Sequence, residues 1–344
     1  MAGVEFAVPG FCPPFTGAAT AQMWEDLGFD VQMFGENHTN SADIFSEMRA
    51  AAQATSRIRL LAGPVNFLTR DPGVIASAIA AVQVASGGRA ICGIARGDSA
   101  VAMVGKRPQR QVDLARDLTA LRAYLERETV TFGDRSSRLE WIGDHPYQPV
   151  PVEMVCSGPK SIAFAATHAD RIGLSVGANP DRIRWALQTI EAALAAEGRS
   201  RREVKVGAFV SVALAPDRVA GRDALRSRVA GWAHMSSFPG NDLSLQPPVL
   251  RRVTSQLRAG YDYRFHRPGV PAENPNTAMI DPEFAEWFGI GGPPTYLVER
   301  LIELAELGIE SFGVTLRPDE REPFADQIMP EVKRAAGTAT DPPP

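Results

Sequence analysis

Two side chains able to carry a proton follow short apolar runs in the N-terminal third of this chain. His38 comes after the run Val31–Gly35, and Asp98 comes after the run Ala90–Ile94, with Gly97 directly before it. The imidazole of histidine changes its charge near neutral pH, and a carboxylate can act as its partner acid or base. Glycine lets backbone N–H groups come close to a ligand. His38 and Asp98 are therefore ionisable groups that each follow a strand-like segment, where an α/β enzyme places such groups beside a ligand.

The elements that would position these groups are eight strand-like segments that alternate with helical patterns. The segments span 4–9, 31–35, 58–65, 90–94, 152–156, 172–176, 204–214 and 311–315. Strict alternation predicts parallel strands joined by crossover helices, and eight such units predict an α/β fold, the closed (β/α)8 TIM barrel. Active sites of such barrels lie at the carboxyl ends of the strands, which would place His38 and Asp98 on one face.

An open, doubly wound sheet is the alternative arrangement of the same elements. That fold class binds dinucleotides through a glycine-rich turn that leads from the first strand into a helix. Here the first strand is followed by residues 9–14, Pro-Gly-Phe-Cys-Pro-Pro, which cannot begin a phosphate-binding helix. The sequence therefore favours the barrel.

Composition and charge limit the possible partners. The 344 residues are 44% hydrophobic and 22% charged, which suits a single barrel domain over residues 1–336. The formal net charge of −4 offers no basic excess for nucleic acid. No apolar run approaches the roughly 20 residues that span a bilayer, and no leader segment begins the sequence. We therefore expect no nucleic-acid or membrane partner and a cytoplasmic location.

The three cysteines, Cys12, Cys92 and Cys156, lie far apart and within or next to apolar runs. Their number is odd, and their spacing is not that of metal ligands. We expect buried free thiols in a reducing compartment and no metal site.

Residues 237–293 interrupt the alternation as a long insertion after the seventh strand. The segment is rich in proline, glycine and arginine, and its aromatic residues include Tyr261, Tyr263, Phe265, Trp287 and Phe288. An insertion at this point of a barrel emerges on the face of the active site. We therefore expect a lid or a wall of the substrate pocket, with a dimer contact as the competing explanation.

Two smaller segments also depart from the alternation. Residues 128–150 have the pattern of a short hairpin before the fifth strand, and residues 337–344 are expected to form a disordered tail.

The residues from Ser86 to Val101 read SGGRAICGIARGDSAV. This run resembles the S-G-G-R-x-x-L-G-x-G-x-G-D-S pattern of the luciferase-like oxidoreductases that use the deazaflavin coenzyme F420. Residues 37–40, Asn-His-Thr-Asn, resemble the aspartate–histidine pair that follows the second strand in that family. The runs 62–72 and 155–161 are similar to its G-V-T-N-P-x-T-R-H-P and A-S-G-P-K segments. The resemblance covers most of the chain.

The resemblance implies coenzyme F420 as the cofactor and hydride transfer to or from a small organic molecule. It implies that His38 is the proton donor and that Asp98 is the partner acid, base or electrostatic stabiliser. Asn37 departs from the family, which commonly has aspartate there, although an amide can still hydrogen-bond a ring carbonyl or N–H group. A deazaflavin has carbon in place of the flavin N5 and carries a hydride as a nicotinamide does.

The remaining implied contacts are to the coenzyme. The family has a cis peptide behind the deazaflavin ring at the position of Gly63–Pro64, and proline lowers the free-energy cost of the cis form. Small residues in the turn 157–161 permit close approach, and the following helix N-terminus offers N–H groups to the phosphodiester of the coenzyme. The implied coenzyme-binding residues are Asn37, Gly63, Pro64, Asn66, Arg96, Gly97, Ser99, Ser157, Gly158, Lys160 and Ser161.

Two other functions stay open at this point. An FMN-dependent monooxygenase would share the barrel and would need reduced flavin and oxygen. A non-catalytic, cofactor-binding subunit could use the same scaffold, although the presence of both His38 and Asp98 argues against it. The residues do not indicate whether the substrate is an alcohol, a carbonyl, an imine, a conjugated alkene or a pterin. They do not indicate the direction of hydride transfer either. We expect a homodimer.

Overall fold

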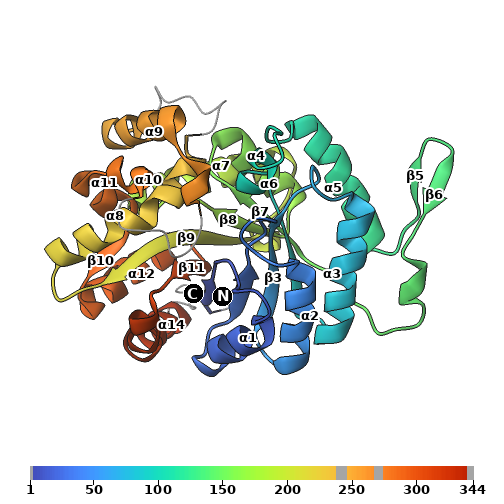
Figure 1. Ribbon diagram of the computed structural model, residues 1–344, viewed down its shortest axis with the longest axis horizontal. Coiled ribbons are helices and arrows are strands. Elements are labelled where there is room, and N and C mark those ends of the chain that lie inside the picture. The colour runs from blue at the N-terminus through green and yellow to red at the C-terminus, as the bar shows by residue number, and fades with distance from the viewer. Residues whose placement is uncertain (1–2, 238–245, 267–273, 339–344) are drawn as a thin grey trace. The chain divides into compact units, whose positions relative to one another are not determined.

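The computed structural model describes all of the chain except residues 1–2, 238–245, 267–273 and 339–344. The chain forms two compact units (Figure 1). The first unit contains Met1–Pro9, Leu27–Phe29 and Val155–Pro344, and the second contains Gly10–Asp26 and Asp30–Met154. The single domain over residues 1–336 stays a prediction.

The eight strands expected from the sequence all form. They are β1 (Glu5–Val8), β2 (Val31–Phe34), β3 (Arg59–Val65), β4 (Ala90–Ile94), β7 (Val152–Cys156), β8 (Arg171–Leu174), β9 (Lys205–Leu214) and β11 (Ser311–Thr315). Their hydrogen-bonded order is β9-β11-β1-β2-β3-β4-β7-β8, and β8 pairs again with β9, so the ring closes. The register is parallel, as in the pair Val31 and Arg59 and the pair Cys92 and Val152. The closed (β/α)8 barrel is confirmed, because an open sheet would end in two edge strands.

These strands form because their residues are mostly apolar, as burial on both faces of a parallel sheet favours, although β2 and β7 also bury Gln32 and Glu153. Every residue of β2 and of β4 is buried. In the first unit, Phe6 of β1 packs with its ring centroid 5.7 Å from that of Phe312 and 5.6 Å from that of Phe324.

The helices of the second unit are α1 (Gly17–Asp26), α2 (Ile44–Ala54), α3 (Pro72–Ser86), α4 (Ser99–Ala102) and α5 (Gln111–Leu125). Three of them, α2, α3 and α4, begin directly after loops that carry candidate site residues. The side chains of Asp43 and Asp71 accept hydrogen bonds from the N–H groups of Ser46 and Gly73, so local capping fixes where α2 and α3 begin.

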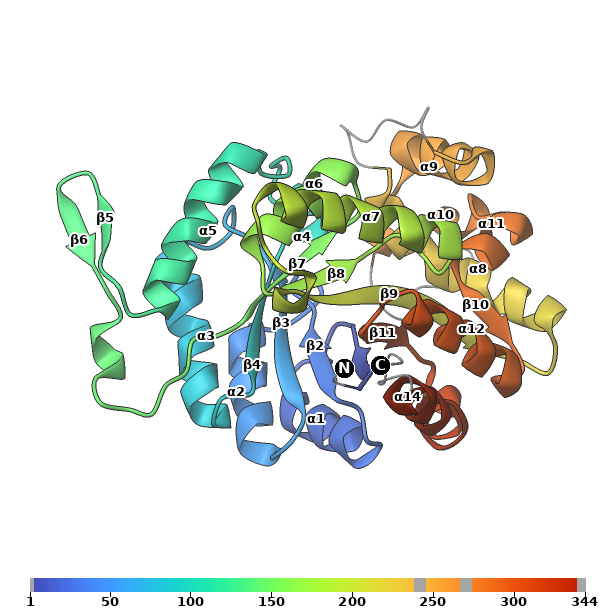
Figure 2. The same ribbon diagram turned by 180° about the vertical axis from the view of Figure 1, so that it is seen from behind.

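The hairpin expected within residues 128–150 is also present. It pairs β5 (Val130–Phe132) with β6 (Arg135–Ser137), and Figures 1 and 2 show it standing away from α3 and α5.

The first unit holds the remaining helices and one strand that the sequence analysis did not expect. The helices are α6 (Pro159–His168), α7 (Pro180–Ala196), α8 (Arg218–Met235), α9 (Pro248–Gly260), α10 (Pro275–Ala278), α11 (Pro282–Phe288), α12 (Pro294–Glu306), α13 (Arg321–Pro323) and α14 (Met329–Thr338). The strand β10 (Ile290–Gly292) pairs in parallel with the carboxyl end of β9. Its sequence, Ile-Gly-Gly, carries no strand pattern, so only pairing with β9 makes it a strand.

The described residues of the insertion 237–293 lie mostly in short helices. Figures 1 and 2 show α9, α10 and α11 gathered around α8. The buried apolar side chains of α9 and α11 share one cluster with α8, which includes Leu225, Val229, Val253 and Phe284. The described part of the insertion is therefore a packed extension of α8, and its expected role as a lid or pocket wall stays a prediction.

The expected tail needs a correction at its start. Gly337 and Thr338 belong to α14. Buried Val332 anchors this helix, and no proline lies between Val332 and Thr338 to end it earlier. The rest of the expected tail, 339–344, lies outside the described residues.

Two further findings bear on the sequence-based expectations. Cys12, Cys92 and Cys156 are buried and free, and burial raises the pKa of Cys92 to about 12, so that thiol is unreactive at neutral pH. Among the described residues, no helix combines the length and the apolar character that crossing a bilayer requires.

Candidate active site

The loop between β2 and α2 carries His38 and is folded around Asn37. The Asn37 side chain is buried, and its Oδ1 accepts hydrogen bonds from the N–H and hydroxyl groups of Thr39 at 3.0 and 2.7 Å. Its backbone carbonyl accepts from the N–H groups of Asn40 and Ser41 at 2.8 and 2.9 Å. His38 itself is exposed. Asn37 therefore shapes the turn that presents His38, a role that the sequence analysis did not assign to it.

A second contact of Asn37 joins this loop to the segment of Asp98. Asn37 Nδ2 donates to Ser99 Oγ at 3.0 Å, and both side chains are buried. Ser99 directly follows Asp98 and is the first residue of α4. The hydrogen bond therefore holds the turn of His38 against the turn of Asp98, across 62 positions of sequence.

Gly97 is required by the tight turn before Asp98. Its φ is +95°, and a Cβ atom there would lie 2.3 Å from Cγ2 of Val101. The carbonyl of half-buried Asp98 accepts from the N–H groups of Val101 and Ala102 at 3.0 and 2.9 Å, which begins α4. The glycine thus places the Asp98 carboxylate at the start of a short helix, next to Ser99.

The end of β3 holds the third group of implied residues. The peptide bond between Gly63 and Pro64 is cis, the geometry that the family resemblance implies, and the pairing with β4 is irregular between Ala62 and Val65. Asn66 is buried, and its Oδ1 accepts three hydrogen bonds of 3.0 to 3.1 Å, from the N–H groups of residues 68 and 69 and from the hydroxyl of residue 69. The Asn66 oxygen therefore holds the turn, and a coenzyme contact would have to use its Nδ2.

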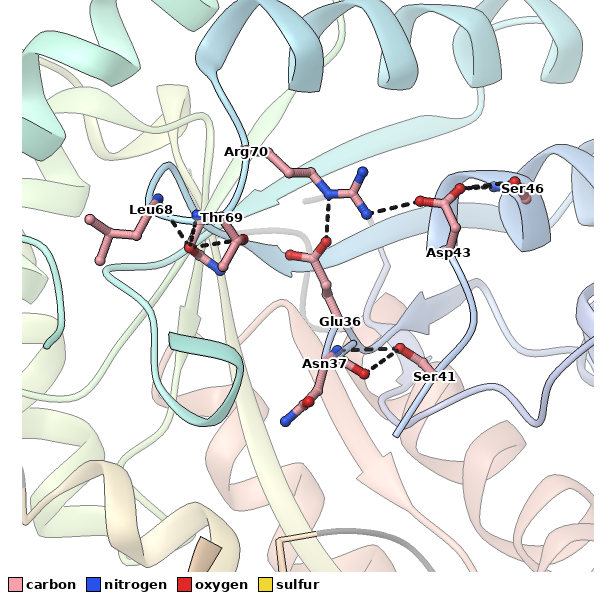
Figure 3. Close-up of polar contacts among 9 residues, drawn as sticks. Glu36, Asn37, Ser41, Asp43, Ser46, Leu68, Thr69 and Arg70 are labelled. Atoms are coloured by element: carbon pink, nitrogen blue, oxygen red, sulfur yellow. Dashed lines mark hydrogen bonds and ion pairs between the residues drawn. The ribbon is translucent and has the colours of Figure 1, made fainter. Parts of the chain in front are cut away.

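Arg70 bridges two carboxylates beside this turn, as Figure 3 shows. Its Nε donates to Glu36 Oε1 at 2.7 Å, and its Nη2 donates to Asp43 Oδ1 at 2.8 Å. The guanidinium also lies over the ring of Phe45, 5.2 Å from the ring centroid. Because Glu36 and Asp43 stand near the two ends of the loop that carries His38, Arg70 ties that loop to the start of α3.

Glu36 is the most enclosed charge of this group. Its side chain is 9% exposed, and in the described part of the chain its Oε2 is buried without a hydrogen-bond partner. Burial raises the pKa of Glu36, whereas the hydrogen bond and the charge of Arg70 oppose that rise. When Glu36 is ionised, the cation of Arg70 therefore compensates its buried negative charge.

A cavity of about 560 Å³ opens beside these loops, a volume within the usual range for ligand sites. Its wall combines charged, polar and apolar side chains. The lining residues are Glu36, His38, Ser41, Ala42, Asp43, Leu68, Thr69, Arg70, Ala100, Val104 and Lys106. Asp98 is not among them, although its neighbour Ala100 is. The cavity can therefore receive a ligand against the imidazole of His38.

Arg96 has a structural contact that the sequence analysis did not foresee. Its Nε donates to the carbonyl of Gln109 at 2.6 Å, and its own carbonyl accepts from the N–H group of Gln109 at 2.8 Å. Arg96 therefore holds the segment that leads into α5.

The turn 157–161 belongs to the first unit. Ser157 Oγ donates to the carbonyl of Met235 at 2.8 Å. Ser161 Oγ donates to the carbonyl of Gly158 at 2.9 Å and accepts from its N–H group at 3.2 Å. Lys160 is exposed. Both serine hydroxyls thus shape the turn.

Sequence reasoning missed Glu36, Asp43, Arg70 and Lys106, which all line the cavity. Glu36 directly precedes Asn37, and Arg70 stands in the run after β3 that carries the family resemblance. The sequence could have indicated Glu36 and Arg70, because both are charged residues that closely follow strands, and the carboxyl ends of the strands form the active-site face of a barrel. In the described part of the chain, no group of His, Cys, Asp or Glu side chains is arranged to hold a metal ion.

Comparison with known proteins identifies the family. Residues 16–311 match the family model of the luciferase-like monooxygenases. The chain belongs to this family. It is an oxidoreductase, because the curated relatives that it resembles along most of its length are reductases and dehydrogenases.

Two of those relatives and one solved structure are similar to this chain along nearly its whole length. The chain is 28% identical to 5,10-methylenetetrahydromethanopterin reductase of Archaeoglobus fulgidus, covering 90% of this chain and 93% of that one. It is 24% identical to F420-dependent glucose-6-phosphate dehydrogenase of Intrasporangium calvum, covering 90% of each. The structure of the coenzyme F420-dependent tetrahydromethanopterin reductase of Methanopyrus kandleri superposes with a TM-score of 0.70 at 20% identity, over 96% of this chain and all of that one. At that identity the superposition supports the barrel fold alone.

Proposed function

We propose that this chain is a coenzyme F420-dependent oxidoreductase that transfers a hydride between the deazaflavin and a small organic substrate, with His38 and Asp98 managing the proton. One observation carries the proposal: the hydrogen bond from Asn37 to Ser99 holds the turn of His38 against the turn of Asp98. The likeness to F420-dependent reductases and dehydrogenases supports the choice of coenzyme.

The residues of the cavity fit a flat, partly polar ring. Leu68, Ala100 and Val104 offer apolar contacts, and His38 and Thr69 offer polar ones. The groups that would hold the ring on the family resemblance are Asn37, Gly63, Pro64, Asn66, Arg96, Gly97 and Ser99, none of which is among the residues that line this cavity. Ser157, Gly158, Lys160 and Ser161 would hold the phosphodiester, with the N–H groups at the start of α6 and the Lys160 cation as the favourable partners.

A bound deazaflavin supplies a two-electron hydride carrier. The protein must then orient the substrate, exclude competing reactions and move one proton. The exposed His38 imidazole can give that proton to the substrate atom that takes up the electron pair of the reduced bond, next to the carbon that receives the hydride, or take it back in the reverse reaction. The half-buried Asp98 carboxylate can stabilise the charge that develops on the imidazole.

The coenzyme is tested by thermal unfolding and fluorescence titration with oxidised F420 and with FMN. Binding of F420 to the folded state should stabilise it by about 2.7 kcal/mol at a hundredfold excess over Kd. FMN should shift the unfolding temperature far less. Stabilisation by FMN alone would replace the proposal with an FMN-dependent monooxygenase, and the absence of an effect of either coenzyme would contradict the proposal. Binding of F420 without turnover of any substrate would favour the non-catalytic, cofactor-binding subunit.

The proposal also includes a homodimer in the cytoplasm. Sedimentation equilibrium measures the mass in solution, and a monomer over the micromolar range would remove the dimer without affecting the proposed chemistry.

A further inference from the structure

One carboxylate among the residues that line the cavity has an oxygen without a hydrogen-bond partner. Glu36 Oε1 accepts from Arg70 Nε at 2.7 Å, and Figure 3 shows Oε2 turned away from Arg70, on the side of the turn that carries Leu68 and Thr69. Both of those residues line the cavity, as Glu36 does. In the described part of the chain, Oε2 is buried and accepts no hydrogen bond. The described residues therefore leave one acceptor of this wall unused.

The other short polar side chains of the wall are already occupied. Asp43 Oδ1 accepts from Arg70, and its Oδ2 accepts from the N–H and hydroxyl groups of Ser46, each at 2.9 Å. The hydroxyl groups of Ser41 and Thr69 each donate their hydrogen to an atom of their own loop at 3.1 Å. Glu36 Oε2 therefore differs from these groups, because nothing in the described residues satisfies it.

A buried acceptor without a partner raises the free energy of the folded protein. Folding removes the oxygen from water, and no hydrogen bond replaces the hydration that it loses. The cation of Arg70 offsets part of the charge through Oε1, but in the described residues nothing donates to Oε2. A ligand that brings a hydrogen-bond donor to Oε2 would remove this cost as it binds, so the oxygen favours ligands that carry a donor.

The rest of the wall limits the kind of donor that fits. When the imidazole is neutral, the two carboxylates of the wall are matched by two cations, Arg70 and Lys106, so the ligand needs no charge of its own. Leu68, Ala100 and Val104 add apolar surface. An uncharged molecule with an apolar body and an N–H or O–H group matches this combination.

We propose that Glu36 Oε2 and the apolar wall beside it form a donor subsite, which binds uncharged molecules that carry an N–H or O–H group on an apolar body. The cavity and Glu36 lie wholly within the second unit. That the bound molecule is the substrate of the oxidoreductase rests on the proposed function, whereas the donor subsite rests on the contacts of Glu36 and on the cavity wall. Glu36 binds and orients the ligand, and the proton of the reaction stays with His38.

Binding of indole and indene to the protein without coenzyme tests the donor subsite. The two molecules have nearly the same shape, but only indole has an N–H group. Indole should bind about tenfold more tightly, because its N–H group gains a hydrogen bond to a charged oxygen. NMR titration of the methyl groups of Leu68 and Val104, which line the cavity, measures Kd and locates the ligand. Equal Kd values for indole and indene, or binding that leaves these methyl signals unshifted, overturn the proposal.

Glu36→Gln should reverse the preference. Arg70 can only donate, so the amide oxygen must face Arg70 and the amide NH2 group takes the place of Oε2. Indole should then lose its advantage over indene, and isoquinoline, whose ring nitrogen only accepts at alkaline pH, should bind several-fold more tightly than to the wild type. An unchanged advantage of indole in folded Glu36→Gln overturns the assignment to Oε2.

Asp113→Asn is the matched control, because it removes a carboxylate that does not line the cavity, and it should leave the Kd values of all three molecules unchanged. If Glu36→Gln does not fold, the comparison of indole with indene in the wild type still decides.

The link to the substrate is tested separately, with F420-loaded enzyme and pairs of ketones or imines that differ only by a hydroxyl or amide group. The member that carries the donor should have a kcat/KM about tenfold higher, through KM, and Glu36→Gln should remove this difference while Kd for F420 stays unchanged. Equal kcat/KM within every pair, or turnover of none, overturns the link. If F420 does not bind while the difference between indole and indene stands, the proposed function fails and the donor subsite remains.

Discussion

Arg70 and Glu36 form an ion pair of 2.7 Å between Nε and Oε1, and it joins a partly exposed cation to a carboxylate that is nine-tenths buried. In the described residues, Oε2 of that carboxylate has no hydrogen-bond partner. Loss of Arg70 would leave a buried charge uncompensated, close to the turn that presents His38.

Arg70→Met should therefore lower the free energy of unfolding by about 3 kcal/mol, the lower end of the range for a broken buried pair, because Arg70 is itself 28% exposed. In the double variant Arg70→Met with Glu36→Gln, part of that loss should return, because an amide needs no counter-charge. Urea unfolding followed by circular dichroism measures both.

The matched control is Arg110→Met, which breaks an exposed ion pair with Asp113 and should leave stability unchanged. If Glu36→Gln restored nothing in the Arg70→Met background, lost packing on Phe45 rather than uncompensated charge would be the cause.

Glu36 also predicts a pH dependence of stability. Burial raises its folded-state pKa above the unfolded value of about 4.3. The protonated form thus contributes stability that is fully present below about pH 4 and is lost as the pH rises through the folded-state pKa. Glu36→Gln should remove this decline, so the variant should gain stability relative to the wild type in urea unfolding as the pH is raised above about 4. A stability difference that does not change with pH contradicts the shift.

Gly97→Ala should be more destabilising than an ordinary substitution of a glycine with positive φ. The left-handed conformation costs a non-glycine residue about 1 to 2 kcal/mol, and the clash with Val101 adds roughly 1 to 3 kcal/mol. Gly105→Ala is the control, because Gly105 also has positive φ but has open space at its Cβ position. Chemical denaturation should rank the two, and Gly97→Ala with Val101→Ala should recover part of the difference.

His38→Ala and Asp98→Asn should each lower kcat and kcat/KM by about a hundredfold or more, while Kd for F420 changes far less. The reason is that proton transfer is an interaction of the transition state rather than of coenzyme binding. Steady-state kinetics on a substrate found by screening alcohols, ketones, imines and conjugated alkenes measures kcat and kcat/KM. Fluorescence titration with F420 measures Kd. Normal turnover in both variants would contradict the proposed acid–base roles of His38 and Asp98. It would not affect the assignment of the fold and the family.

Lys160→Ala is the contrasting variant for that experiment. Its cation would serve the acidic part of the coenzyme, so its removal should weaken coenzyme binding and reduce the salt dependence of binding, with kcat at saturation preserved. A loss of kcat with unchanged Kd would instead place Lys160 in the chemistry.

The sequence by itself determined the barrel strands and the starts of several helices. Strands buried on both faces are mostly apolar, so β4 is visible as an apolar run and β2 as one that only Gln32 interrupts. The caps at Asp43 and Asp71 and the positive φ of Gly97 depend on bonds and clashes within a few residues. The family resemblance rested on such local runs as well.

Only the tertiary structure decided which of these side chains meet. The contacts of Asn37 with Ser99, of Arg70 with Glu36 and of His234 with Tyr263 join residues 62, 34 and 29 positions apart. Such partners are selected by the order of strands in the ring and by the packing of the insertion on α8. A pattern of residue types along the chain shows neither the strand order nor this packing. Hydrogen bonds and ion pairs need their atoms within a few ångströms of each other, and such distances exist only once the whole core is packed.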